Sequence, residues 1–306
     1  MRVVITGATG LIGTAVVRAL RARGDTVVAL SRDPGRARET LGPDVEAQAW
    51  PAPKQEPPPA AALEHADAVI HLLGEPIAQR WTEEAKQEIR DSRVLATRSL
   101  VAGLAALPSD RRPSRFVSQS ATGYYGPRTG EPVDETASSG EDFLGVVAAD
   151  WEREASAIGS DIRVVLARTG VVLAAEGGAL SKMLPPFRLG VGGPVAGGRQ
   201  YVPWIHRDDV VGALLLCLDD ERAVGPINLT APNPVTNAEL SRALGRVLNR
   251  PAVLPVPGLA LRLLYGQMAD TVLTGQRAVP KRLLELGYRF QFGDVEAALR
   301  DALSRA

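Results

Sequence analysis

The 306 residues of this chain balance 35 Lys and Arg against 35 Asp and Glu, which argues against nucleic-acid binding because that needs an excess of positive charge. Hydrophobic residues make up 45%, enough to form the core of one large α/β domain or of a domain with a smaller lobe. The longest apolar runs are well short of the ~20 residues that span a bilayer and no leader precedes the first strand, so we expect a cytoplasmic protein without membrane contact.

Short β-branched segments alternate along the chain with longer segments of helical periodicity, which is typical of a doubly wound parallel sheet. The predicted strands span 2–6, 26–30, 68–72, 115–118, 163–167 and 227–230, and the predicted helices span 14–23, 82–106, 143–158 and 210–218. After Thr169 the pattern changes, and the glycine-rich residues 174–200 are predicted to be irregular. We therefore place a boundary near residue 170.

A glycine-rich loop joins the first strand to the first helix. Gly7 permits a tight turn, Gly10 lets a pyrophosphate approach the backbone, and Gly13 lets the helix pack closely on the strand. The N-terminus of the helix also offers unpaired N–H groups and the positive end of a dipole. The segment predicts a dinucleotide site made by Thr6, Gly7, Thr9, Gly10, Leu11, Ile12 and Gly13.

The order of the elements and this loop together predict the fold class. We expect an α/β fold with a Rossmann doubly wound parallel sheet and a smaller C-terminal substrate lobe. The Rossmann domain is predicted to span 1–170, with 200–230 returning to it, and the lobe to span 171–306.

The end of the second strand distinguishes NADP from NAD. An NAD site usually carries Asp or Glu here, which binds the ribose 2′-hydroxyl and repels a 2′-phosphate. This chain has Ser31 and Arg32 instead, with Arg36 and Arg38 close by. A hydroxyl and guanidinium groups suit a phosphate dianion. The sequence therefore predicts NADP(H) as the cofactor, with Ser31 and Arg32 in its site.

Four segments resemble the extended short-chain dehydrogenase/reductase superfamily, and the resemblance covers essentially the whole chain. They are 6–13 (TGATGLIG), 67–74 (DAVIHLLG), 118–126 (SQSATGYYG) and 204–210 (WIHRDDV). The chain looks most like a branch of NAD(P)-dependent epimerase/dehydratase-like proteins with an extra C-terminal domain of unknown function. Features similar to that branch are 80–81 (RW), 92–93 (SR), 150–152 (DWE), 168–170 (RTG), 198–200 (GRQ) and a tail from about Val253.

The usual acid/base pair of that superfamily, Tyr-x-x-x-Lys on the helix after the serine strand, is missing. Aligning the helix on Glu152 puts Leu144 and Ala148 at the two positions, and aligning it on Phe143 puts Val147 at the lysine. Neither alignment supplies a proton donor, so ordinary reductase or epimerase chemistry needs a replacement. Binding of the cofactor does not depend on this pair.

The resemblance points to the serine strand as the source of that replacement. Ser120 would donate a hydrogen bond to a substrate oxygen, and Tyr124 or Tyr125 would donate the proton. For the tyrosines the alternative is packing at the exit of the strand. His206 is a possible acid or base, but in the similar motif this segment packs the lobes together. The three histidines show no metal-ligand spacing, and no metal is expected.

Further cofactor contacts are expected where the third and fourth strands end and on the helix after the serine strand. They are Trp50, Leu72, Gly74, Glu75, Arg80 and Val147. Trp50 would cover the adenine or else lie in the core. Arg80 would clamp a phosphate or carboxylate, and Glu75 would contact the cofactor. The alternative for both Arg80 and Glu75 is a structural ion pair. Lys86 is expected to be solvated.

Two functions remain open from the sequence. The favoured one is an NADP(H)-dependent, epimerase-like oxidoreductase that acts on an unknown small carbonyl or sugar-nucleotide substrate through an unusual proton donor. The alternative is a non-catalytic NADP(H)-binding protein with a redox-sensing or regulatory role. The resemblance also implies a possible homodimer through the helices at 82–106 and 143–158.

Overall fold

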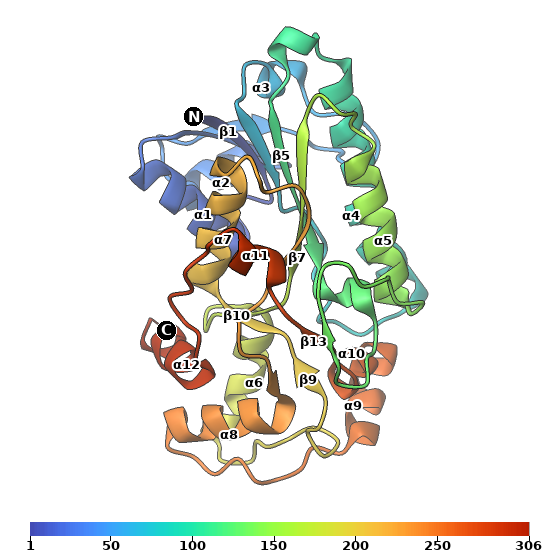
Figure 1. Cartoon of the computed structure of the whole chain (residues 1–306), viewed down its shortest axis with the longest axis vertical. Helices are drawn as coiled ribbons and strands as arrows, with labels where there is room; N and C mark the ends of the chain where they lie inside the picture. The colour runs from blue at the N-terminus through green and yellow to red at the C-terminus, as the bar shows by residue number, and fades with distance from the viewer. Residues whose placement is uncertain (306) are drawn as a thin grey trace.

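The computed structural model describes residues 1–305, and its centre is a parallel sheet of seven strands (Figure 1). The strand order is β3-β2-β1-β4-β5-β7-β11. The strands are β1 (Arg2–Thr6), β2 (Thr26–Ser31), β3 (Glu46–Ala49), β4 (Ala68–His71), β5 (Arg115–Ala121), β7 (Arg163–Thr169) and β11 (Gly225–Leu229). The chain winds one way from β1 to β3 and the other way from β4 onward, so a topological switch point lies between β1 and β4. The predicted α/β fold class is confirmed.

Helices cover both faces of the sheet (Figure 1). One face packs against α1 (Leu11–Ala22) and α7 (Arg207–Asp219), with α2 (Pro34–Leu41) beside α1. The other packs against α3 (Ala60–Leu63), α4 (Glu83–Ala106) and α5 (Phe143–Ser156). Alternation along β1 explains the two cores, because Val3 and Ile5 face the first set of helices and Val4 faces the second. Thr82 begins α4 as its cap, since its hydroxyl accepts the N–H of Ala85.

The C-terminal lobe lies at the carboxyl ends of the strands, at the lower end of Figure 1. It contains α6 (Gly178–Arg188), α8 (Asn237–Leu248), α9 (Gly258–Tyr265), α10 (Asp270–Leu273), α12 (Val295–Ser304) and the short strands β8 (Val171–Leu173), β9 (Tyr201–Val202), β10 (Trp204–His206) and β12 (Val235–Thr236). A third core, around the buried Trp204, joins α6, α8 and α12. A cleft between a Rossmann sheet and such a lobe is where ligands of these folds bind.

Residues 174–200 were expected to be irregular, and this prediction is wrong in part because α6 lies within them. Leu180, Leu184 and Phe187 recur at helical spacing and are all buried. Pro185 and Pro186 fall in the last turns of this helix. Burial of the apolar face thus outweighs the cost of the two prolines.

The last part of the chain packs on both halves of the molecule. β13 (Arg277–Ala278) pairs in parallel with β6 (Pro132–Val133), which follows β5 along the chain. From α11 (Lys281–Glu285) onward, Leu283 and Leu286 join the first core of the Rossmann sheet. Leu283 and Leu286 follow the expected boundary at residue 170 in the sequence, but they pack in the core of the Rossmann domain.

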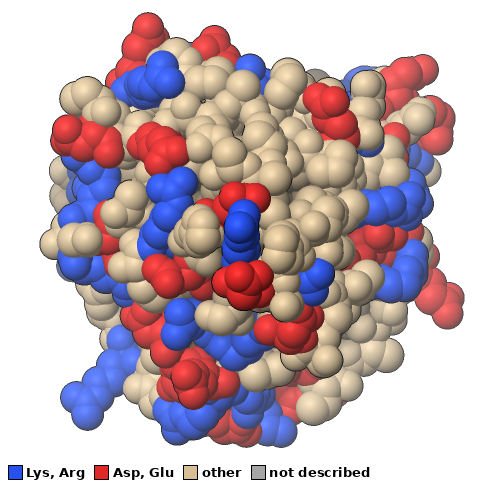
Figure 2. Space-filling model, turned by 90° about the horizontal axis from the view of Figure 1, so that it is seen from above, with Lys and Arg blue, Asp and Glu red and all other residues tan. Residues whose placement is uncertain are grey.

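The surface carries charges of both signs. In the view of Figure 2, Lys and Arg side chains lie among Asp and Glu side chains rather than in one large patch. Within residues 1–305, no helix is long and apolar enough to cross a membrane.

Candidate functional site

The glycine loop between β1 and α1 has the shape that a dinucleotide needs. Gly7 has a positive φ of 68°, and a Cβ there would lie 2.7 Å from the carbonyl oxygen of Leu72. A Cβ on Gly13 would collide with the carbonyl of Gly7. Gly10 begins α1 with no side-chain cap, and it is exposed together with Thr9. The first N–H groups of α1 are thus available to an anion, and α1 begins three residues earlier than predicted.

Thr6 and Leu72 fix this loop to the neighbouring strand. The Thr6 hydroxyl is fully buried, lies 2.6 Å from His71 Nδ1 and accepts the N–H of Leu72 at 3.2 Å. His71 Nε2 lies 2.9 Å from the hydroxyl of Thr97, and burial lowers the pKa of His71 to about 3. His71 is therefore neutral between two hydroxyls. Thr6 acts by holding β1 to β4, because its hydroxyl faces the interior.

Two arginines after β2, Arg32 directly behind the strand and Arg36 in the first turn of α2, have guanidinium groups without a partner within residues 1–305. Arg32 and Arg36 are exposed, and neither guanidinium has a hydrogen bond or an ion pair with a described residue. Arg38 differs, since it donates to the carbonyl of Ala47 at 3.3 Å. The nearby carboxylate of Asp33 caps α2 by accepting the N–H of Arg36 at 3.0 Å. Arg32 and Arg36 are thus free to meet a phosphate beside the glycine loop.

Two side chains of α4 form hydrogen bonds with the backbone of the loop after β4. The N–H of Glu75 donates to the hydroxyl of Ser92 at 3.0 Å, and Arg93 donates to the carbonyl of Glu75 at 2.9 Å. Arg93 is largely buried, which lowers its pKa to about 10. A Cβ on Gly74 would lie 3.1 Å from the Arg93 guanidinium carbon. The Ser92-Arg93 pair is therefore a support for the loop that was expected to border the cofactor.

Three of the predicted cofactor residues have other surroundings. Trp50 is 2% exposed in the core and donates its indole N–H to the carbonyl of Glu56 at 2.9 Å, so it offers no face to an adenine. Arg80 donates to the carbonyls of Leu263 and Leu264 at the end of α9. It joins the loop to the C-terminal lobe instead of facing a ligand. Val147 is buried in α5. For Trp50 the alternative of a core position fits these contacts, whereas Arg80 bonds to backbone carbonyls and not to the expected ion-pair partner.

Two predicted catalytic residues lie in a buried polar network under the site. Ser120 is fully buried and donates to Glu152 Oε1 at 2.6 Å. Arg168 forms a two-point ion pair with Glu152, with both N–O distances at 2.8 Å. Tyr125 is also fully buried, donates to Asn228 Oδ1 at 2.7 Å and accepts from Arg168 at 3.1 Å. Burial raises the pKa of Tyr125 to about 12. The hydroxyls of Ser120 and Tyr125, which were expected to donate to a substrate, thus bond inside this network instead. The network joins β5, α5, β7 and β11.

Tyr124 has a different environment from its neighbour. Its ring packs edge-on against Tyr125, and the Arg168 guanidinium carbon lies 3.5 Å from the ring centroid. The side chain is half-exposed, and within residues 1–305 its hydroxyl has no hydrogen-bond partner. Of the three predicted catalytic hydroxyls, that of Tyr124 is the one left free to reach a ligand.

Sequence reasoning missed Glu135, which completes the network. Its Oε1 accepts the N–H groups of Asn228 at 3.0 Å and Arg282 at 3.1 Å, while Oε2 is buried without a described hydrogen-bond partner. Burial raises the pKa of this carboxyl. Glu135 comes from the loop after β6 and Arg282 from α11, so no local pattern could have paired them.

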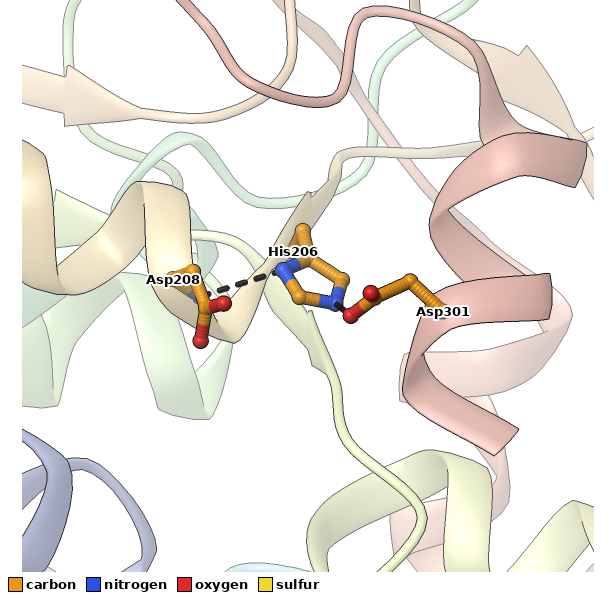
Figure 3. A group of neighbouring side chains, drawn as sticks. All are labelled: His206, Asp208 and Asp301. Atoms are coloured by element: carbon orange, nitrogen blue, oxygen red, sulfur yellow. Dashed lines mark hydrogen bonds and ion pairs between the residues drawn. The ribbon is translucent and has the colours of Figure 1, made fainter. Parts of the chain in front are cut away.

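His206 joins the lobe to the Rossmann half (Figure 3). Its Nδ1 accepts the N–H of Asp208 at 3.1 Å, its Nε2 lies 3.2 Å from Asp301 Oδ2, and its ring stacks on Phe292. Burial lowers the pKa of His206. Arg305 pairs with both aspartates, at 2.8 and 2.9 Å. These groups could surround a metal ion, but Arg305 pairs with both carboxylates and Arg207 Nε lies 3.8 Å from Asp208 Oδ1, so two cations balance the two aspartates. The cluster therefore fastens α12 to the start of α7.

A parallel sheet in this order, an open glycine loop at its switch point and a lobe over the strand ends define a dinucleotide-binding protein of the extended short-chain dehydrogenase/reductase class. The chain belongs to the NAD dependent epimerase/dehydratase family, whose model matches residues 3–229, and a domain of unknown function matches residues 256–302. Both matches confirm the resemblance found in the sequence.

Named relatives span almost the whole chain. The chain is 42% identical over 306 residues to epimerase family protein Mb2239 of Mycobacterium bovis, covering 99% of this chain and 98% of that protein. It is 40% identical over 302 residues to an Arabidopsis thaliana protein named epimerase family protein SDR39U1 homolog, chloroplastic, covering 98% and 86%. A crystal structure of human epimerase family protein SDR39U1 (isoform2) with NADPH has a TM-score of 0.89 and 35% identity, covering all of both chains. The cytoplasmic location and the homodimer stay predictions.

Proposed function

We propose that this chain is an NADP(H)-dependent, epimerase-like oxidoreductase that acts on a small carbonyl or sugar-nucleotide substrate. The observation that carries the cofactor is the pair of arginines after β2, Arg32 and Arg36, whose guanidiniums have no partner within residues 1–305 and which follow the strand next to an open glycine loop. A guanidinium without a protein partner suits the 2′-phosphate of NADP(H). The structure of the human relative with NADPH supports the same cofactor.

The nicotinamide supplies the hydride when the cofactor is bound, and the protein must stabilise the charge that forms on the substrate oxygen. Tyr124 is our candidate for this role, because its hydroxyl has no described partner and its ring is held by Arg168 and Tyr125. Ser120 could contribute only after its hydroxyl leaves Glu152. We therefore rank Tyr124 before Ser120 and Tyr125 as the catalytic residue.

A lysine from α4 lies near the place of the missing pair. Lys86, which was expected to be solvated, is half-buried, and its ammonium lies 5.8 Å from the centroid of the Phe143 ring. Phe143 also packs edge-on against Trp81, and Lys86 pairs with Glu83 at 3.1 Å. In one alignment Phe143 takes the position of the superfamily tyrosine. Lys86 can therefore supply, from a neighbouring helix, a positive charge like that of the missing lysine.

The buried network of Ser120, Tyr125, Glu152 and Arg168 supports the alternative function, a non-catalytic NADP(H)-binding protein. Ser120 and Tyr125 both have their hydroxyls directed into it, which removes two of the three expected donors. A protein that binds NADP(H) and passes its redox state to a partner would need no such donor.

One experiment separates these functions. NADPH and NADH are first titrated against the purified protein, and the NADPH complex is then mixed with aldehydes, ketones and sugar nucleotides while the NADPH absorbance is followed. Oxidation above background, lost in Tyr124→Phe, supports the enzyme. Tight NADPH binding without oxidation by any member of the panel supports the regulatory protein. Failure to bind either nucleotide contradicts both.

A further inference from the structure

Arg277 is a half-buried arginine whose guanidinium has no hydrogen-bond or ion-pair partner within residues 1–305. Every other buried or half-buried arginine within residues 1–305 donates to, or pairs with, an oxygen or sulfur atom. The guanidinium of Arg277 has no such acceptor among the described residues, and its Nε is buried. Removing a guanidinium from water without an acceptor is costly. An arginine in this state suggests that a ligand completes its hydrogen bonds.

The side chain is held in place by an aromatic ring and by its own strand. Its guanidinium carbon lies 5.2 Å from the centroid of the Tyr201 ring, within the range of a cation–π contact. The Tyr201 ring in turn approaches Gly130, where a Cβ would lie 3.6 Å from Cε2. The backbone of Gly275 is packed so closely on Tyr201 that a Cβ at position 275 would collide with the Tyr201 carbonyl. The guanidinium is thus oriented before any ligand arrives.

Arg277 lies near the carboxyl end of β5, on the side of the sheet away from the glycine loop. The preceding residue, Gln276, donates to the carbonyl of Thr122 at 2.7 Å, and Thr122 follows β5 directly. β5 and β7 lie on the side of β4 opposite to β1 and β2, which carry the glycine loop and Arg32. In Figure 1, β13 lies between the lower end of the sheet and α10. A ligand at Arg277 would therefore lie beyond the nicotinamide end of the cofactor and not at the 2′-phosphate.

We propose that Arg277, supported by Tyr201, binds an oxyanion of the substrate, either a phosphate or a carboxylate. This inference rests on the proposed function, because it names the substrate class of the same cleft. A guanidinium fork matches both anions through two parallel hydrogen bonds. The substrate is then an anionic molecule, and a neutral aldehyde or ketone lacks the group that this residue recognises.

The test uses two probe anions, inorganic pyrophosphate and malonate, with protein saturated with NADPH so that the cofactor site is filled. Binding is followed by calorimetry and by the shift in melting temperature. Wild-type protein should bind at least one probe, and Arg277→Gln should bind it at least ~10-fold more weakly, which corresponds to about 1.4 kcal/mol. Arg277→Lys, which keeps the charge but loses the fork, should fall between them. Preference for pyrophosphate indicates a phosphate-bearing substrate, and preference for malonate a carboxylate.

Arg289→Gln is the matched control, since Arg289 is exposed and has no acceptor among the described residues. It should leave probe binding unchanged. Equal binding in wild type and Arg277→Gln, or no binding of either probe to the wild type, would overturn the inference. Should Arg277→Gln fail to fold, the comparison is made with Arg277→Lys and Tyr201→Leu. Loss of NADPH binding by the wild type contradicts the proposed function instead, and the first titration detects it separately.

Discussion

Ser120 on β5 and Glu152 on α5 form a fully internal hydrogen bond of 2.6 Å, and Arg168 holds the same carboxylate with two further bonds. In the extended superfamily that this chain resembles, a serine at this place faces the substrate. Here it is part of a network that joins the sheet to a helix. Loss of that bond should therefore appear first as a loss of stability.

Ser120→Ala should lower the free energy of unfolding by about 1–2 kcal/mol, because a buried charged acceptor loses one donor. NADPH affinity should not change. Urea unfolding measures the first effect and fluorescence titration the second. Ser118→Ala is the control, since that buried hydroxyl donates to a neutral carbonyl at 3.3 Å and should cost less. Unchanged stability with lost turnover would instead place the Ser120 hydroxyl on the substrate.

Tyr124→Phe and Tyr125→Phe should have opposite main effects. The first removes a hydroxyl with no described partner and should reduce turnover by roughly 10²-fold with little effect on stability. The second removes bonds to Asn228 and Arg168 and should lower stability by about 1–2 kcal/mol. Steady-state rates and urea unfolding of both variants check this. Full activity of Tyr124→Phe would move the search for the donor to Lys86.

Arg32→Ala should remove most of the preference for NADPH over NADH, which we expect to be at least ~10-fold in the wild type. Affinity for NADH should remain nearly the same, because the 2′-hydroxyl needs no cation. Calorimetric titration with both nucleotides measures this. Arg38→Ala is a matched control, since its guanidinium is engaged by the carbonyl of Ala47. Equal affinity of the wild type for the two nucleotides would refute the assignment of Arg32.

Gly10 and Gly13 should respond differently to substitution. A Cβ at Gly10 would lie 3.3 Å from the Gly7 carbonyl oxygen, so Gly10→Val should fold but block the pyrophosphate. A Cβ at Gly13 collides with Gly7, so Gly13→Ala should distort the loop itself and lower the melting temperature. Circular dichroism and NADPH titration distinguish the two. Normal NADPH binding by Gly10→Val would mean that the nucleotide lies elsewhere.

The stability of the protein should fall as the pH drops below the ordinary histidine range. The pKa of His71 is about 3 in the folded chain and ~6.5 when unfolded. As the pH falls, the unfolded state therefore takes up the proton first. The contribution of neutral His71 to the free energy of unfolding is present above pH ~6.5 and is lost as the pH falls toward 3. The slope of unfolding free energy against pH should approach about 1.4 kcal/mol per unit for this residue. Carboxylates add their own effects below pH ~5.

Urea unfolding between pH ~7 and ~5 tests this, with His71→Asn compared with His65→Gln. His65 is exposed, so its replacement should leave the slope unchanged. His71→Asn should reduce it, and the remaining slope should come from His206, whose pKa burial also lowers. Identical slopes in wild type and His71→Asn would show that His71 can be protonated without unfolding.

The sequence by itself determined the glycine loop of the dinucleotide site. The strand–loop–helix at residues 2–22 has its glycines where backbone and pyrophosphate come close, and these constraints are local, within a few residues of chain. The same holds for Arg32, which directly follows β2 in the sequence. The order of strands and helices followed from hydrophobic periodicity, which is local as well.

The tertiary structure decided what lies on the other side of the cofactor. Alternation along β5 puts Ser118 and Ser120 on one face of the sheet. It does not predict that Glu152 and Arg168 lie against that face. Likewise, nothing local pairs Arg277 with Tyr201 or Glu135 with Arg282. Such contacts depend on how distant segments pack, because a buried polar group takes whichever partner the neighbouring element brings within reach. The cofactor can thus be predicted from the chain, whereas the fate of each catalytic hydroxyl depends on the packing around it.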